Sequence, residues 1–201
     1  DKEALEILDL PEDEYVIISD RTYFDYVYDA EKLRTFSGKK YHKKKNNLNY
    51  FKREYEGRYQ FKLLGEQDTE EILQYLENWK DTKSHAEEHE FIESEAKGIK
   101  FLLEHEEVFD FKIGGVYIDG KLEAFCIGNY YEPEDMVYLP VEKANPEIRG
   151  LYQYICSEFL IEVFPYAGKE NREDDMGIEG LRRSKESYNP IYMVEKYTVI
   201  Q

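Results

Sequence analysis

An Asp-Gly pair between two strand-like runs is the feature that most constrains how this chain can fold. Residues 110–131, DFKIGGVYIDGKLEAFCIGNYY, place Asp119 and Gly120 between two segments rich in β-branched and aromatic residues. An Asp-Gly pair readily adopts the positive φ angles that a two-residue hairpin turn requires. A third strand-like run, DMVYLPVEKAN (135–145), follows. We therefore expect three consecutive antiparallel strands.

Helical periodicity flanks these strands on both sides. The strand-like run RYQFKLLG (58–65) precedes a helix that Asp68 can cap and a second helix over 86–104. After the three strands come a helix, a probable short strand, a short helix over 178–187 and a last strand over 191–200. This order predicts an α/β (α+β) fold whose mixed, mostly antiparallel sheet is flanked by helices.

The helix after the third strand has a clear start signal. Asn145 is a favoured N-cap residue, Pro146 suits the first helical position, and Glu147 suits the first turn. Its inner face is expected to consist of Ile148, Leu151, Ile155 and Phe159.

The first 37 residues contain too few apolar positions for a core of their own. They comprise a helix-like decapeptide, a strand-like run over 14–20 and a stretch, 21–38, that we interpret as a helical connector ending at Gly38. We expect residues 1–37 to be the tail of a preceding domain and a linker, with one domain over 38–201.

Basic charge is concentrated in one segment of an acidic chain. The sequence holds 27 Lys and Arg against 44 Asp and Glu, a formal net charge of −17, which argues against non-specific binding to nucleic acid or membranes. Yet KKYHKKKNNLNYFKR (39–53) carries seven basic and no acidic residues, and the rest of the chain has a net charge of −24.

The basic segment has helical periodicity, with Tyr41, Leu48, Phe51 and Tyr55 on one face. Two interpretations follow. Either the lysines only flank a packed seam and balance charge, or Lys43, Lys44 and Lys45 contact an anionic partner such as tRNA.

Two features bear on the compartment. Cys126 and Cys156 lie far apart in apolar surroundings, so we expect two reduced core residues. The sequence has neither an apolar run of about 20 residues nor an N-terminal signal pattern. We expect a bacterial, cytoplasmic protein and leave its oligomeric state open.

Three segments carry a family resemblance: residues 25–55, ANPEIRGLYQYICSEF (144–159) and NREDDMGIEGLRRSKESYNP (171–190). With the element order, they resemble the C-terminal domain family of phosphatidylglycerol lysyltransferase, which has the GNAT-like acyltransferase fold. The resemblance implies that residues 1–37 end a first GNAT-like unit. It also implies transfer of an acyl or aminoacyl group, from acyl-CoA or aminoacyl-tRNA, to an amine or hydroxyl, without a tightly bound cofactor.

The resemblance places donor binding where the third strand meets the next helix. In this fold that strand splays from its neighbour, and the helix N-terminus attracts anions. The implied donor-binding residues are Asn145, Arg149, Gly150 and Tyr152, with Glu142 as the candidate general base. The alternatives are ordinary capping at Asn145, a surface role for Arg149 and a solvated strand-end carboxylate.

The same resemblance places Asn171, Asp175, Arg182 and Lys185 on the acceptor or anion-binding side. The alternative is an ion-pair network between Arg182, Lys185 and the acidic turn at 174–175. The tyrosines that could line an acceptor cleft are Tyr130, Tyr131, Tyr138 and Tyr152.

Two further hypotheses remain. HAEEH (85–89) matches an inverted zinc-protease pattern, but the sequence has no evident third ligand, so we expect no metal site. The bulky Tyr152 stands where acetyl-CoA-binding relatives have a small residue. This favours, as an alternative to an enzyme, a non-catalytic binding or scaffold module that has lost its donor site.

Overall fold

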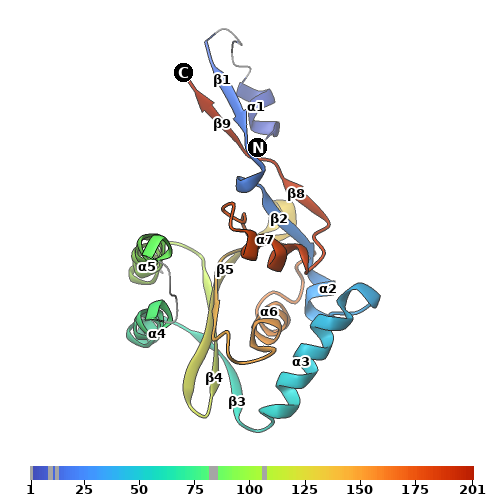
Figure 1. Ribbon diagram of the computed structural model, residues 1–201, viewed down its shortest axis with the longest axis vertical. Coiled ribbons are helices and arrows are strands. Elements are labelled where there is room, and N and C mark those ends of the chain that lie inside the picture. The colour runs from blue at the N-terminus through green and yellow to red at the C-terminus, as the bar shows by residue number, and fades with distance from the viewer. Residues whose placement is uncertain (1, 9–10, 12–13, 82–85, 106–107) are drawn as a thin grey trace.

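One twisted sheet with helices on both faces forms the body of the protein (Figure 1). The computed structural model describes residues 2–8, 11, 14–81, 86–105 and 108–201, except for the side chains of residues 80–92. The helices are α1 (Lys2–Leu8), α2 (Ala30–Thr35), α3 (His42–Glu54), α4 (Thr69–Asp81), α5 (Ala86–Glu104), α6 (Leu151–Glu162) and α7 (Glu179–Glu186). The strands are β1 (Val16–Ser19), β2 (Asp25–Asp29), β3 (Tyr59–Leu64), β4 (Lys112–Ile118), β5 (Lys121–Tyr131), β6 (Met136–Ala144), β7 (Lys169–Asn171), β8 (Tyr192–Val194) and β9 (Tyr197–Ile200).

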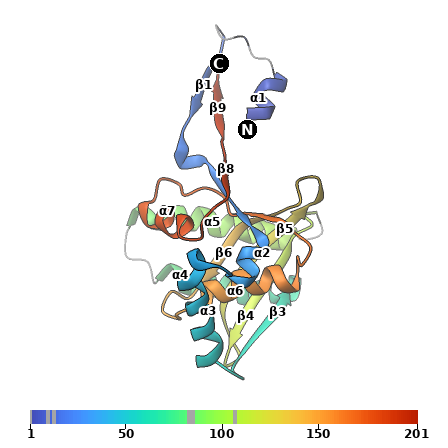
Figure 2. The ribbon, with the colours of Figure 1, turned by 90° about the vertical axis from the view of Figure 1, so that its right-hand side faces the viewer.

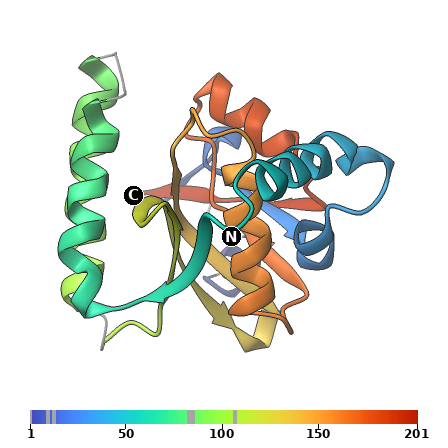
Figure 3. The same cartoon turned by 90° about the horizontal axis from the view of Figure 1, so that it is seen from below.

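The seven strands of the main sheet are ordered β3-β4-β5-β6-β7-β2-β8, and every adjacent pair is antiparallel except β6–β7. Helices α4 and α5 cover one face, while α6, with α3 and α2, covers the other (Figure 3). The predicted α/β fold with a mixed, mostly antiparallel sheet is therefore confirmed.

The predicted hairpin at Asp119-Gly120 connects β4 and β5, and both residues have positive φ, 50° and 82°. The side chain of Arg58 pairs with the Asp119 carboxylate across the sheet edge. The third expected strand is β6, which pairs with β5 along its length.

A β-bulge in β6 separates that strand from β7. Ile127 pairs with Val141 and Asn129 with Tyr138, so Leu139 and Pro140 together oppose one residue of β5. Pairing between β6 and β7 ends at Tyr138, just before this bulge. A bulge bends its strand, and Pro140 has no N–H to donate. Beyond the bulge, β6 stays paired with β5 as far as Ala144 but no longer pairs with β7, and we call this end of β6–β7 pairing the opening.

The start of α6 differs from the predicted one. Asn145 does not cap the helix: its Oδ1 accepts a bond from the Glu147 N–H at 3.0 Å within a turn. The helix begins at Leu151, after Gly150, whose φ is 88°. A Cβ at Gly150 would clash with the backbone carbonyl of Asn47 in α3. Glycine is needed here because α3 packs directly against the first turn of α6.

The prediction of a helix over 21–38 is wrong in its first half. Residues 25–29 form β2, a strand between β7 and β8, and only residues 30–35 are α-helical. Tyr26, Val27 and Tyr28 have no exposed surface, so this strand has no polar face that would reveal it in the sequence. Residues 25–36 thus pack in the same core as the domain expected over 38–201, and a preceding domain stays a prediction.

The expected last strand is divided in two. β8 joins the main sheet, whereas β9 pairs with β1 in a two-stranded ribbon that projects from the body (Figure 2).

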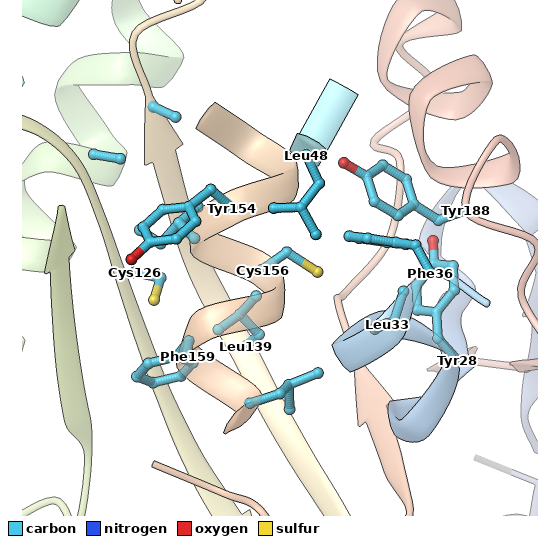
Figure 4. Close-up of a cluster of buried hydrophobic side chains, with 14 of the residues drawn as sticks. Tyr28, Leu33, Phe36, Leu48, Cys126, Leu139, Tyr154, Cys156, Phe159 and Tyr188 are labelled. Atoms are coloured by element: carbon cyan, nitrogen blue, oxygen red, sulfur yellow. The ribbon is translucent and has the colours of Figure 1, made fainter. Parts of the chain in front are cut away.

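The core between α6 and the sheet is rich in aromatic side chains. In Figure 4, Tyr28, Leu33, Phe36 and Tyr188 lie on one side of Cys156, while Tyr154 and Phe159 lie on the other. The predicted seam of α3 is confirmed, because Tyr41, Leu48 and Phe51 are buried in this cluster. Both cysteines are free and buried, as predicted.

Gly150→Ala tests the close approach of α3 to α6. The substitution forces a strained φ and a clash with a backbone carbonyl, so we expect a loss of about 3 kcal/mol in the free energy of unfolding, measured by urea denaturation. Gly180→Ala is the control, because a Cβ there meets nothing within 4 Å. It should change stability by no more than about 1 kcal/mol. Equal effects at both positions would contradict the packing described.

Candidate functional site

An ion pair bridges the opening between β6 and β7. Arg172 follows β7, and its guanidinium donates to the carboxylate of Glu142 on β6. The two side chains are 13% and 7% exposed, so the pair is almost fully desolvated yet reachable from solvent. The Arg172 N–H donates to the backbone carbonyl of Tyr26 in β2 at 3.0 Å. The chain after β7 thus stays bonded to β2 and not to β6. Hydrogen bonding between β6 and β7 therefore ends at this point, and the Glu142 and Arg172 side chains fill the space between the two segments.

Glu170, two residues before Arg172, is a second carboxyl group in this region. It has no exposed surface, and in the part of the chain that the structure describes neither of its oxygens has a hydrogen-bond partner. Burial raises its pKa to about 7; the nearby Arg172 lowers it and Glu142 raises it. A buried carboxyl with a near-neutral pKa is a common property of functional sites.

Aromatic rings and a thiol surround the Arg172 guanidinium. Its Cζ lies 5.0 Å from the ring centroid of Tyr188 and 6.0 Å from that of Tyr28, and Nη1 lies 3.6 Å from Cys156 Sγ. Burial would lower the pKa of Arg172, but the carboxylates of Glu142 and Glu170 raise it, so the guanidinium stays charged.

Two lysines from different helices complete the cluster. Lys185 of α7 donates to the carbonyls of Arg172 and Glu173, the second at 3.1 Å. Lys44 of α3 has its Nζ 3.5 Å from the centroid of the Tyr188 ring. Burial, followed by the charge of Arg172, lowers the pKa of each lysine to about 8. We call Lys44, Glu142, Glu170, Arg172 and Lys185 the charged cluster.

The three lysines expected to act together are separated by the structure. Lys43 and Lys45 are exposed on the outer side of α3, and only Lys44 reaches the charged cluster.

The predicted donor-binding residues are engaged in contacts within the protein. Arg149 donates from Nε to Asn47 Oδ1 at 3.0 Å and stacks over Tyr50. Gly150 packs against the backbone of α3, and the partly buried Tyr152 contacts the core. Asn145 lies apart from them: its amide donates to Glu123 at 2.9 Å.

Asn145 belongs to a different surface cavity, of about 610 Å³. Of the described side chains, the carboxylates of Glu70, Glu71, Glu123 and Glu147 and the ammonium group of Lys121 are the charged groups that line it. This lining is unfavourable for a phosphate-bearing donor.

The predicted acceptor-side residues form a bonded network. Asp175, fully buried, accepts bonds from Arg182, from Arg21 at 2.8 Å and from the Tyr26 hydroxyl at 2.5 Å. The bonds from Arg182, and then those from Tyr26, the Gly177 N–H and Arg21, lower the pKa of Asp175 despite its burial. Asn171 is also buried and bonded, to Asp25 at 3.1 Å. Of the four predicted residues, only Lys185 belongs to the charged cluster.

The tyrosines predicted to line a cleft are not gathered. The hydroxyl of Tyr130 bonds to Asp135 at 3.0 Å and that of Tyr138 to Glu134 at 2.7 Å, near the turn between β5 and β6. Tyr131 is exposed at the same end. Tyr152 follows the opposite end of β6.

Sequence reasoning gave no role to Glu170 or Tyr188, and it included Arg172 only as part of the family motif on the acceptor side. The spacing of two between Glu170 in β7 and Arg172 just after it, which places both on one face of an extended segment, was the available signal. It was too short to use, since β7 has only three residues.

The metal hypothesis rests on side chains that lie outside the described part of the chain. His85 of the HAEEH string lies outside the described residues, as does the side chain of His89. Among the residues that the structure describes, no group of three or more His, Cys, Asp or Glu side chains is placed to hold a metal ion. None of the described helices is long and apolar enough to cross a bilayer.

The mixed sheet, whose β6–β7 pairing ends over α6, defines an α/β domain with helices on both faces. The chain belongs to the family described as phosphatidylglycerol lysyltransferase, C-terminal, whose sequence model matches residues 6–200. This confirms the resemblance predicted from the sequence.

Individual relatives agree with this assignment. The crystal structure of a conserved protein of unknown function from Bacteroides thetaiotaomicron is 31% identical, with a TM-score of 0.85 over 98% of this chain and 65% of that one. The structure of L-PGS from Bacillus licheniformis, 17% identical, has the same fold, with a TM-score of 0.62 over 93% of this chain and 62% of that one. An uncharacterized protein of Mycoplasmoides gallisepticum is 28% identical over 178 residues, 87% of this chain and 55% of the relative. The chain thus spans less than two thirds of each relative.

Arg172→Met tests the ion pair in the opening. The variant leaves Glu142 buried without its partner, so we expect a loss of about 3–5 kcal/mol in the free energy of unfolding at pH 8, measured by urea denaturation. Arg183→Met, at a side chain that is 72% exposed, is the control and should change stability by about 0.5 kcal/mol or less. A loss below about 1 kcal/mol for Arg172→Met would contradict a closed, desolvated pair.

Glu170→Gln tests the buried carboxyl group. Because its folded-state pKa is raised to about 7, its contribution to stability is fully present below the unfolded-state pKa and is lost as the pH rises through 7. The wild type should lose up to about 3 kcal/mol from this group between pH 5 and pH 8. Glu170→Gln should flatten that part of the stability profile, whereas Glu179→Gln, at an exposed position, should not. Parallel profiles for wild type and Glu170→Gln would show that Glu170 does not titrate in this range.

Proposed function

We propose that this chain transfers an acyl or aminoacyl group from an activated donor to an amine or hydroxyl, at the opening between β6 and β7. The observation that carries the proposal is the end of β6–β7 pairing at Tyr138, beside a buried charged cluster, in a member of a family described as a lysyltransferase. An opened sheet edge presents unpaired backbone groups to an extended donor. No tightly bound cofactor is needed for this chemistry.

Glu142 is the proposed proton acceptor. The attacking amine or hydroxyl must lose a proton as its bond to the carbonyl carbon forms and the donor's ester or thioester bond breaks. Glu142 faces the opening, and Arg172 fixes its orientation through the charge-assisted bond. Arg172 is a positioning residue in this scheme.

Aminoacyl-tRNA is the donor that these contacts favour over acyl-CoA. The residues expected to hold a CoA pyrophosphate, Arg149 and Gly150, are packed against α3. The exposed lysines of the same helix, including Lys43 and Lys45, offer a basic flank to a polyanion in a chain that is otherwise strongly acidic. Their role as tRNA contacts is part of this proposal.

A non-catalytic binding or scaffold module is the second candidate. It is favoured by the Glu142–Arg172 pair itself, since the two side chains fill the opening that a donor would enter. On this alternative no donor would be turned over.

Transfer of labelled lysine from lysyl-tRNA to phosphatidylglycerol micelles or to a small amine tests the proposal, with acetyl-CoA as the second donor. We expect Glu142→Gln to lower the rate about 100-fold, because the proton acceptor is lost. Glu147→Gln, an exposed carboxylate beside α6, is the matched control and should keep the wild-type rate. If neither donor is consumed and neither raises the thermal midpoint of the wild type, the enzyme hypothesis fails and the binding module stands.

A further inference from the structure

Lys44 is a partly buried cation whose charge has little local compensation. Its ammonium group rests on the face of Tyr188, 3.5 Å from the ring centroid. A cation–π contact offsets only part of the cost of removing an ammonium group from water. Burial and then the charge of Arg172 lower the pKa of Lys44 to about 8, so the contact with Tyr188 does not recover the whole cost of burying the charge.

Four of the other half-buried lysines in the described part of the chain have an oxygen partner. Lys143 pairs with Glu95 at 2.7 Å, Lys196 with Asp25 at 2.5 Å and Lys52 with Glu158 at 3.7 Å. Lys185 donates to two backbone carbonyls. In the described part of the chain, no carboxylate lies within ion-pair distance of Lys44, so its three donors are free for an oxygen atom from outside.

The charges around Lys44 are predominantly positive. Arg172 lies on the same Tyr188 ring, at 5.0 Å, and lowers the pKa of Lys44, as does Lys43. Among the described residues, the carboxylate of Glu142 acts on Lys44 and raises its pKa, but it already accepts a bond from Arg172. Lys44, Arg172 and Lys185 all keep some exposed surface, so an anion can reach them.

We propose that Lys44, at the outer end of the charged cluster and beside Arg172, binds a phosphate group of the donor. The site differs from the helix N-terminus at Leu151, because it is built from α3, the segment after β7 and the end of α7. This inference rests on the proposed function only in naming the phosphate as the donor's. The shared chemistry is a phosphate oxyanion, which either the 3′ end of a tRNA or coenzyme A can supply.

The lysines of α3 would contact an anion in two different ways. Lys43 and Lys45 are exposed and would contribute weak, salt-dependent attraction. Lys44 is held on a ring in a partly desolvated setting, where a charge pair is screened less by salt. Lys44 would therefore make a specific contact with the phosphate, whereas Lys43 and Lys45 would only attract the anion at longer range.

Protection of lysines from chemical acetylation tests the site directly. The probe is inorganic pyrophosphate, added to the intact chain at constant ionic strength, and mass spectrometry gives the acetylation rate of each lysine. At about ten times the dissociation constant, the rate at Lys44 should fall about tenfold, since only the free protein reacts. Lys43 and Lys45, neighbours on the same helix, serve as internal controls and should be unchanged. An unaltered rate at Lys44, or equal protection of all three lysines, would overturn the proposal.

Deacylated tRNA and coenzyme A then distinguish the two sources. The probe that corresponds to the natural donor should protect Lys44 from acetylation. Its affinity should fall about tenfold in Lys44→Gln. Lys44→Arg keeps the charge and should bind this probe within about twofold of the wild-type affinity. Lys97→Gln, at an exposed lysine of α5 on the other face of the sheet, is the control for the loss of one charge. If Lys44→Gln binds both probes as tightly as the wild type, the site is not used.

The transfer assay separates this inference from the proposed function. Transfer without protection of Lys44 overturns the phosphate site and leaves the enzyme intact. Protection without transfer supports the phosphate site in a non-catalytic module.

Discussion

The ion pair between Arg172 and Glu142 is the interaction on which the functional end of this domain depends. It forms because a bulge at Leu139 and Pro140 ends the pairing of β6 with β7, leaving a gap that side chains must fill. Two charges there are costly to desolvate, and each is tolerated because the other is present. The same guanidinium lies beside Glu170 and packs on Tyr188. One residue thus links three strands, α6 and the chain after α7.

Helix α3 determines which surfaces remain available for a ligand. It packs so closely against the first turn of α6 that only glycine fits at position 150, and its Asn47 side chain bonds to Arg149. These contacts occupy the helix N-terminus at which an anion would otherwise bind. The same packing brings Lys44 over Tyr188. The positive charge available to a donor therefore lies on α3 and not at the N-terminus of α6. The exposed lysines beyond it are then free to attract polyanions over longer distances.

Much of the fold could be predicted because local signals agreed with one another. The hairpin at Asp119-Gly120, the helical seam of α3 and the order of elements after Tyr59 each follow from turn chemistry or periodicity. The same reasoning failed at residues 25–29, because a strand buried on both faces shows no alternation. It also failed at Asn145, where a good capping signal is overridden by the packing of α3 on Gly150. Local preferences are worth about 1 kcal/mol, which tertiary contacts exceed.

For the site, the sequence by itself determined the family, the acidic background and the concentration of lysines between residues 39 and 53. It also placed Glu142, Lys44 and Lys185 among the candidates. Only the tertiary structure decided that these three share one cluster with Glu170 and Arg172, and that Asp175 and Arg182 belong to a separate bonded network. The physical reason is that burial and pairing set the chemistry of a charged side chain. Both depend on contacts between residues from different elements, such as Glu142 and Arg172, which are 30 positions apart, and no local pattern records their proximity.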